Sequence, residues 1–154
     1  MKTVDACYIV SEKQTDIRKV ELDAPGYGEL QIEVKACGIC AWDSYLFLGR
    51  DMTEPFPFRF GHEAVGVVAE VGEGVTGFEV GDQVFCIEGG PELAQMINIS
   101  AEKAAHLPGI PEKDFPYYVC EPAACVVSGI NCINVHPGDD VAVIGCGYMG
   151  LLNV

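Results

Sequence analysis

The N-terminal part of the chain alternates short apolar runs with turn-forming residues, a pattern typical of a β-rich domain. Apolar and β-branched side chains gather in short segments bounded by glycine, proline and aspartate. These segments cover residues 4–10, 17–22, 30–36, 64–71, 83–87 and 93–99. Glycines crowd residues 61–81, as expected where a sheet bends sharply or one backbone passes close to another. We therefore expect a mainly β barrel or sandwich.

The pattern changes after Pro116. Residues 117–130 are apolar without strict alternation and contain many small side chains, which predicts a helix buried on most sides. After a turn, the apolar run 141–144 has the composition of a buried parallel strand, and residues 151–154 can begin a helix. A strand, a glycine loop and a helix start together form the opening of a βαβ unit.

The length of the chain limits the number of domains. With 154 residues, 49% of them hydrophobic, it can bury one sizeable core but is too short for two full domains. The turn after residue 134 marks the boundary. We expect one domain over residues 1–138 and the start of a second over residues 139–154.

The charge of the chain disfavours several classes of partner. Nine basic residues against 23 acidic ones give a formal net charge of −14, so no cationic surface could neutralise phosphates. We expect a small-molecule substrate, no nucleic acid and no membrane. The N-terminus carries charges and no later apolar run could span a bilayer, which predicts a cytoplasmic protein. The eight cysteines should then be small core residues or ligands.

Several residues could together hold a metal ion. A catalytic zinc needs three soft or borderline protein ligands and an open fourth position for a substrate oxygen. Cys40, His62 and Glu121 supply such a set. Asp43 can accept the second imidazole N–H of His62, which would fix the tautomer of the ligand. Glu63 lies beside His62 in the chain and can coordinate directly or exchange with water.

Each of these residues also has an ordinary structural explanation. Cys37 and Cys40 alone could be a redox pair, half of a zinc knuckle or two buried thiols. His62 alone could be a hydrogen-bonded core histidine, and Glu63 a solvated charge. Glu121 is harder to explain in this way, because a carboxylate within an apolar helix is costly unless it is paired or metal-bound.

A glycine loop follows the expected strand. Its glycines fit the dinucleotide pattern of a tight turn, a close backbone approach to pyrophosphate and close helix packing. The pattern is weak alone, and its position directly after a predicted strand strengthens it. The expected cofactor-binding residues are Gly145, Gly147, Tyr148, Met149 and Gly150.

Taken together, these motifs resemble the zinc-containing medium-chain dehydrogenase/reductase family. Residues 61–75 match G-H-E-x-x-G-x5-G-x2-[IV] at every fixed position, and residues 37–43 resemble C-G-I-C-x-x-D. Further matches follow in the family's order at residues 81–84 and 135–150. The resemblance covers nearly the whole chain. It implies a GroES-like barrel that holds the catalytic zinc, followed by the start of a Rossmann domain that binds NAD or NADP.

The resemblance also implies roles for single residues. Cys40 and His62 would be zinc ligands, and Cys37 a neighbour of the site. Glu121 is followed by proline, as in the E-P-L-A segment of the polyol, threonine and glucose dehydrogenase branches. Glu121 would then be the third ligand, with the adjacent Cys120 as the fallback.

The sequence departs from the family pattern in three places. The family's structural zinc uses four cysteines, whereas none lies between Cys86 and Cys120, which implies a single zinc per chain. Trp42 stands where the family often has a Ser or Thr that passes the hydroxyl proton, and Tyr45 where a His commonly continues this relay. Because Trp has no acceptor, a relay would need Tyr45, Glu63 or water. The Trp42 indole could instead wall the substrate pocket.

The function implied is that of a zinc-dependent NAD(P) alcohol or polyol dehydrogenase, a homodimer or homotetramer acting on an alcohol, polyol or carbonyl compound. The acidic residue that reads the ribose should lie about 20 residues further along than the glycine loop. We therefore expect the isolated chain to bind zinc but to be inactive. Two alternatives stay open: a stand-alone zinc-binding barrel or interaction module, and a thiol redox protein that uses Cys37 and Cys40.

Overall fold

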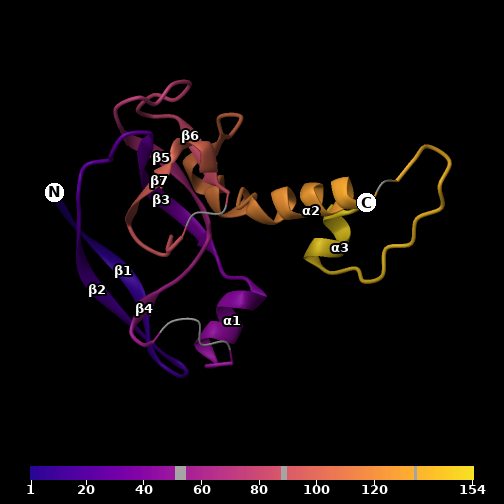
Figure 1. Ribbon diagram of the computed structural model, residues 1–154, viewed down its shortest axis with the longest axis horizontal. Coiled ribbons are helices and arrows are strands. Elements are labelled where there is room, and N and C mark those ends of the chain that lie inside the picture. The colour runs from indigo at the N-terminus through magenta and orange to yellow at the C-terminus, as the bar shows by residue number, and fades with distance from the viewer. Residues whose placement is uncertain (51–54, 88–89, 134) are drawn as a thin grey trace.

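The computed structural model describes residues 1–50, 55–87, 90–133 and 135–154 (Figure 1). Strands predominate and form two antiparallel sheets, with a few short helices around them. No helix in this part of the chain combines the length and the apolar character that a membrane crossing requires.

The smaller sheet contains the N-terminus. Its strands lie in the order β2 (Gln14–Leu22), β1 (Lys2–Ser11) and β4 (Phe58–Arg59). The larger sheet has the order β7 (Met96–Ser100), β3 (Glu29–Gly38), β5 (Glu63–Val71), β6 (Gln83–Cys86) and β8 (Ala104–His106). The six segments expected from the hydrophobic pattern correspond to β1, β2, β3, β5, β6 and β7. The strands β4 and β8 were not anticipated, because two or three residues are too few to show an alternation.

The two sheets meet along one line. An isolated bridge pairs Ala6 with Ala94, and Cys7 N–H donates a hydrogen bond to Leu93 O at 2.9 Å. Over the described residues the sheets do not close into a complete barrel, since each keeps its own edge strands. The expected mainly β fold is confirmed, and its two sheets form an open arrangement instead of a closed barrel.

The main core lies on one face of the larger sheet. Leu30 and Ile32 of β3 and Val68 of β5 are at most 1% exposed and belong to one cluster of apolar side chains. Residues two apart in a strand share a face, whereas neighbours in sequence point to opposite faces. Val65 accordingly lies in a different cluster, where it packs with Phe115. Both faces of β5 are therefore buried.

Short helices connect and flank the sheets. α1 (Ala41–Phe47) follows β3, and the 3₁₀ turns η1 (Ala101–Lys103) and η2 (Glu112–Tyr117) follow β7 and β8. α2 (Glu121–Cys132) and α3 (Tyr148–Leu152) lie against each other at one end of the molecule. The hydrophobic pattern did not predict α1, because only Asp43 and Leu46 of this short helix are buried.

α2 is far more exposed than its apolar sequence predicts. It projects away from the sheets (Figure 1), and only Pro122 and Val126 are buried. Val127 is 58% exposed and Ile130 40%. The prediction of a helix buried on most sides is therefore wrong for the described structure, because its elements cover only one side of α2.

The strand expected at residues 141–144 does not form. This segment has irregular backbone, and Ile144 is 99% exposed. A parallel strand is held by hydrogen bonds to a neighbouring strand, and none of the described strands pairs with this segment. The helix expected after the glycine loop is present as α3, which begins at Tyr148.

Gly66 offers a test of how closely β3 and β5 approach. A Cβ at Gly66 would lie 2.1 Å from Glu33 O and 2.9 Å from Ile32 Cγ2. We expect Gly66→Ala to lower the free energy of unfolding by about 1–3 kcal/mol, because the strands must move apart. Gly129→Ala in α2 is the control, since an added Cβ there meets nothing within 4 Å; it should stabilise by up to about 1 kcal/mol. Urea unfolding measures both, and equal stability of the two variants would contradict the packing described.

Candidate metal centre

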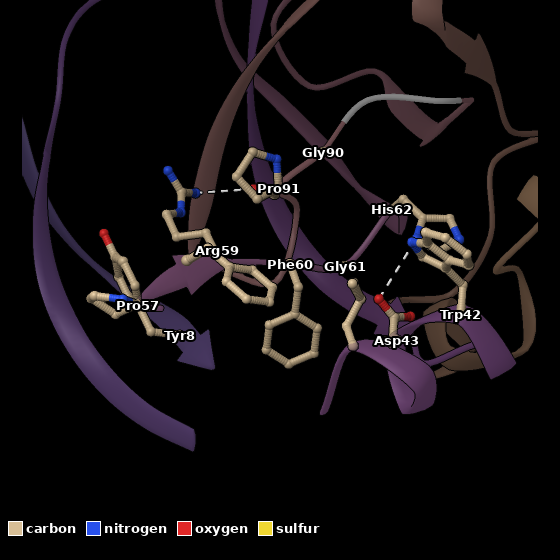
Figure 2. A pocket seen from close by; sticks show the side chains of 12 residues that line it. Tyr8, Trp42, Asp43, Pro57, Arg59, Phe60, Gly61, His62, Gly90 and Pro91 are labelled. Atoms are coloured by element: carbon tan, nitrogen blue, oxygen red, sulfur yellow. Dashed lines mark hydrogen bonds and ion pairs between the residues drawn. The ribbon is translucent and has the colours of Figure 1, made fainter. Parts of the chain in front are cut away.

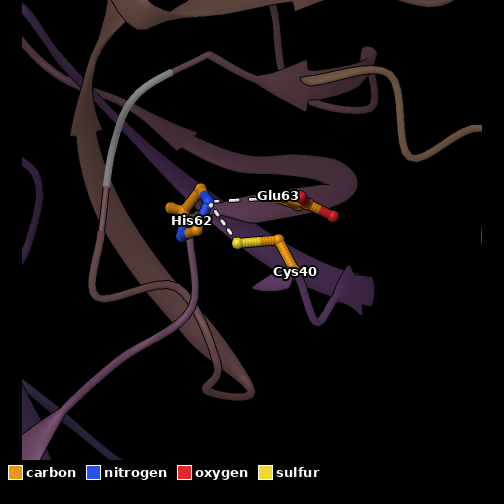
Figure 3. A group of neighbouring side chains, drawn as sticks. All are labelled: Cys40, His62 and Glu63. Carbon is orange, nitrogen blue, oxygen red and sulfur yellow. Dashed lines mark hydrogen bonds and ion pairs between the residues drawn. The ribbon is translucent and has the colours of Figure 1, made fainter. Parts of the chain in front are cut away.

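Three side chains with metal-binding atoms converge where β3 and β5 meet α1 (Figure 3). One ligand atom each of Cys40, His62 and Glu63 lies within 4.8 Å of the other two. Cys40 Sγ is 3.3 Å from His62 Nε2, and His62 Nε2 is 4.0 Å from Glu63 Oε1. A thiol, an imidazole and a carboxylate at these distances are a donor set that zinc accepts.

The register of β3 against β5 brings these residues together. In this antiparallel pair Gly38 lies opposite Glu63. Cys40 comes two positions after the end of β3, and His62 one position before the start of β5. Both ligand atoms therefore lie at the same end of the ladder. A shift of one residue in this register would turn Glu63 to the other face of the sheet.

The start of α1 fixes the position of Cys40. Cys40 is the N-cap residue: its Sγ accepts a hydrogen bond from Trp42 N–H at 3.1 Å, and its own N–H donates to Asp43 Oδ2 at 2.9 Å. This reciprocal arrangement has the geometry of a capping box. Burial raises the pKa of the Cys40 thiol, while the backbone hydrogen bonds from Asp43 and Trp42 lower it. The thiol is thus held at the helix start in a position where a cation could replace its proton.

Asp43 lies behind His62. Its side chain is 1% exposed, and Asp43 Oδ1 is 3.7 Å from His62 Nδ1, too long for a hydrogen bond. Oδ1 has no hydrogen-bond partner within the described structure. A buried carboxylate oxygen that faces Nδ1, with Nε2 turned towards Cys40, is the arrangement in which a metal-ligating histidine is usually held. The orphaned oxygen and the donor set both fit a zinc ion.

Negative groups surround the ligand atoms. Burial raises the pKa of Glu63; His62 lowers it, and the carboxylates of Glu121, Asp43 and Glu92 raise it. Negative groups so close together repel one another. A divalent cation would offset this repulsion, because it would be the largest local charge in the site.

Glu121 stands outside the three-residue group. It is the first residue of α2, and its Oε1 accepts a hydrogen bond from Cys125 Sγ–H at 2.9 Å. That bond, together with burial, raises the pKa of Cys125 to about 11. Glu121 nevertheless lies near enough to raise the pKa of Glu63. Among the described residues, the carboxylate gathered beside Cys40 and His62 is therefore Glu63 and not Glu121.

A buried carboxylate that the sequence analysis did not single out supports the segment around His62. Glu92 is 0% exposed. Its Oε2 accepts from Ala64 N–H at 2.7 Å, its Oε1 from Gly90 N–H at 3.1 Å, and its own N–H donates to Gly61 O at 2.9 Å. Gly61 has a φ of 88°, which favours glycine. Glu92 thus holds the chain on both sides of His62, and an acidic residue just before an apolar run was the only sign of it in the sequence.

A cavity of about 580 Å³ opens beside His62 (Figure 2). This volume falls within the usual range of small-molecule sites. Trp42 lines the cavity, together with aromatic side chains that include Phe58 and Phe60. Tyr45, also on α1, is 49% exposed and does not belong to the lining. Of Trp42 and Tyr45, the two residues at the family's relay positions, only Trp42 therefore faces this space.

The glycine loop before α3 turns as its sequence predicts. Gly145 has a φ of 113°, and a Cβ on Gly150 would lie 1.9 Å from Gly145 O. Gly147 caps α3, whose first residues Tyr148 and Met149 are 61% and 45% exposed. The loop thus has the tight turn and the close helix packing of the dinucleotide pattern, without a described strand before it.

Known proteins similar in sequence are alcohol dehydrogenases. Residues 26–110 match the alcohol dehydrogenase GroES-like domain. The chain is 43% identical over 84 residues to alcohol dehydrogenase class-3 of Cereibacter sphaeroides; the aligned residues make up 54% of this chain and 22% of that protein. It is 32% identical over 158 residues to S-(hydroxymethyl)glutathione dehydrogenase of Komagataella pastoris; this alignment covers 88% of this chain and 42% of that protein. The chain thus spans less than half the length of these relatives.

Solved structures share the fold. 2R,3R-butanediol dehydrogenase from Bacillus subtilis has a TM-score of 0.78 and 27% identity, over 97% of this chain and 53% of that one. A protein designated a zinc-binding dehydrogenase, from Sinorhizobium meliloti and bound to NADP, has a TM-score of 0.78 and 26% identity, over 100% of this chain and 52% of that one. Both comparisons extend over the sheets, the metal centre and the glycine loop.

The role of Glu92 can be tested by removing its acceptors. Glu92→Ala should lower the free energy of unfolding by about 1–3 kcal/mol for each buried N–H left without a partner. Hydrogen exchange at the Ala64 amide should become faster, because this N–H loses its acceptor. Glu92→Gln keeps one carbonyl oxygen as an acceptor. Its free energy of unfolding should therefore lie between that of Glu92→Ala and that of the unsubstituted chain. Unchanged exchange at Ala64 in Glu92→Ala would show that Glu92 does not hold this segment.

Cys37 tests the thiol-redox interpretation. Burial raises the pKa of Cys37 to about 12, and only the thiolate is an effective nucleophile. At pH 8 we expect iodoacetamide to modify the exposed Cys132 and Cys146 and to spare Cys37, as read by peptide mass spectrometry. In guanidinium the three should react alike, which controls for intrinsic reactivity. Rapid alkylation of Cys37 in the folded chain would instead favour a redox pair.

Proposed function

Since the chain belongs to the family of the alcohol dehydrogenase GroES-like domain, we propose that it is the catalytic part of a zinc-dependent NAD(P) alcohol or polyol dehydrogenase. The observation that carries this proposal is the convergence of Cys40, His62 and Glu63 beside an open cavity. The chain spans about half the length of its relatives. Hydride transfer between an alcohol or carbonyl compound and a nicotinamide is therefore proposed for the whole protein.

Cys40 and His62 would hold a single catalytic zinc, with Glu63 or Glu121 as the third ligand. When bound, zinc supplies a Lewis acid that polarises the reacting oxygen of the substrate. Asp43 keeps the imidazole in position, because its buried Oδ1 faces Nδ1 and is available to accept the N–H of that nitrogen. The carboxylates around the site stabilise the cation and are in turn relieved of their mutual repulsion.

The substrate would enter the cavity beside His62 and Trp42. The Trp42 indole has only an N–H donor and cannot relay a proton, so its part is to wall the cavity and exclude water. Tyr45 lies outside the cavity lining, so a relay through Tyr45 would need a bridging water.

The glycine loop would receive the pyrophosphate of NAD or NADP. Its backbone turns at Gly145 and passes close to Gly150, and the remaining contacts would come from Gly147, Tyr148 and Met149. We assign residues 1–138 to the catalytic domain and residues 139–154 to the start of the cofactor domain. The whole protein is proposed to be a cytoplasmic homodimer or homotetramer.

Metal analysis tests the proposal directly. After reconstitution and removal of free metal, the purified chain should retain about one equivalent of Zn²⁺, the stoichiometry of a catalytic site of three protein ligands. Cys40→Ala and His62→Ala should each lose it. Cys132→Ala, which removes an exposed thiol remote from the cluster, is the matched control and should keep it. A reconstituted chain without zinc, or zinc retained by Cys40→Ala, would overturn the assignment.

The same preparation decides the third ligand. With Co²⁺ in place of Zn²⁺, the visible spectrum reports the donor set, so substitution of a ligand should change it. Glu63→Gln and Glu121→Gln are isosteric, and each removes one carboxylate. The variant whose spectrum and affinity change identifies the carboxylate that binds.

A further inference from the structure

The cavity beside His62 also contains an arginine with an unmet hydrogen-bonding capacity. Arg59 of β4 lines the cavity and donates from Nη2 to Pro91 O at 3.0 Å (Figure 2). Its Nε–H is buried and has no acceptor within the described structure. Among the ion pairs of the described residues, none includes Arg59. The guanidinium therefore keeps its positive charge without a carboxylate partner.

The surroundings of Arg59 make this unusual. The chain has 23 acidic residues and only 9 basic ones, so carboxylates are plentiful. Around the guanidinium the cavity is lined by Tyr8, Pro57, Phe58 and Phe60, which lower the local polarity. A partly buried charge in such a place is costly unless something pairs with it. An anion admitted by the cavity would pair with this charge.

Arg59 and His62, one residue of the candidate metal cluster, line the same cavity. Arg59 lies three positions before His62, so their Cα atoms are at most about 11 Å apart. Figure 2 shows Arg59 towards one end of the cavity and His62 towards the other, with Phe60 and Gly61 between them. A ligand that touches both ends would need an anionic group at one end and its reacting oxygen at the other.

We propose that this cavity binds an alcohol that carries a carboxylate, with Arg59 holding the carboxylate and the hydroxyl placed at the Cys40–His62 cluster. This inference rests on the proposed function and names its substrate class as a short-chain hydroxycarboxylate or the corresponding oxo acid. Arginine pairs with carboxylates through parallel, charge-assisted N–H···O bonds. Neutral diols of the same length lack this contact.

The lining favours a carboxylate over a phosphate group. Among the described residues that line the cavity, Arg59 is the only Arg or Lys, and one of its N–H groups already donates to Pro91 O. Asp43 lies in the same lining. A phosphate dianion would need more donors than this cavity supplies and would be repelled by Asp43, whereas a singly charged carboxylate is matched by one guanidinium.

A test that needs no metal follows the Arg59 side chain itself. In the ¹⁵N-labelled chain, the Nε–H resonance of Arg59, identified by its loss in Arg59→Met, should shift and saturate on titration with butyrate. It should not shift with 1-butanol, and inorganic phosphate should shift it less than butyrate does. No shift with butyrate, or an equal shift with the alcohol, would overturn the proposal whether or not the chain binds zinc.

A second test uses the Co²⁺-loaded chain, whose visible spectrum reports ligands that reach the metal. We expect 4-hydroxybutyrate to bind about tenfold more tightly than 1,4-butanediol, because one charge-assisted pair contributes that much. Arg59→Met should bring the two ligands to equal affinity, and Arg59→Lys should keep part of the preference. Lys113→Met, which removes one positive charge from η2 away from the cavity, should keep all of it.

The two proposals fail in different ways. A chain that binds no metal contradicts the proposed function, while the butyrate titration still reports on Arg59. A chain that binds metal but does not distinguish 4-hydroxybutyrate from the diol, or whose preference survives Arg59→Met, contradicts the carboxylate assignment alone.

Discussion

The antiparallel pairing of β3 with β5 is the constraint on which the rest of the site depends. Because Gly38 lies opposite Glu63, the chain leaves β3 for α1 at the same place where it enters β5. Cys40 and His62, 22 positions apart in sequence, thereby come within 3.3 Å of each other. Close contact at Gly66, where a Cβ would meet Glu33 O, leaves no room for another register.

The site is built from groups that are unfavourable without a cation. Asp43, Glu63 and Glu92 are buried carboxylates within one small region, and burial raises the pKa of both Cys40 and Glu63. The fold reduces this cost locally through hydrogen bonds from backbone N–H groups to Asp43 and Glu92. The remaining negative charge is the electrostatic complement of a metal ion, as the donor set requires. Binding of the proposed metal ion would therefore also stabilise this part of the molecule.

Local patterns in the sequence were sufficient for most of the β structure. Strands with one buried face alternate apolar and polar residues whatever lies around them, so six of the eight strands in the described part of the chain could be predicted. The helix at α2 was predicted, but its exposure was not, because periodicity does not tell whether a second element covers a helix. The run 141–144 has the composition of a strand. A strand forms only where a neighbouring strand pairs with it, and none of the described strands pairs with this run.

By itself the sequence determined the chemistry available: the thiol, imidazole and carboxylates of Cys40, His62, Glu63 and Glu121, and the glycine loop that begins at Gly145. These follow from residue type and spacing along short segments. Only the tertiary structure decided that Glu63 lies with Cys40 and His62 while Glu121 pairs with Cys125, that Glu92 holds the chain beside His62, and that Arg59 lines the same cavity as His62. The physical reason is that these contacts join residues distant in sequence, and their geometry exists only once the sheets have paired and packed.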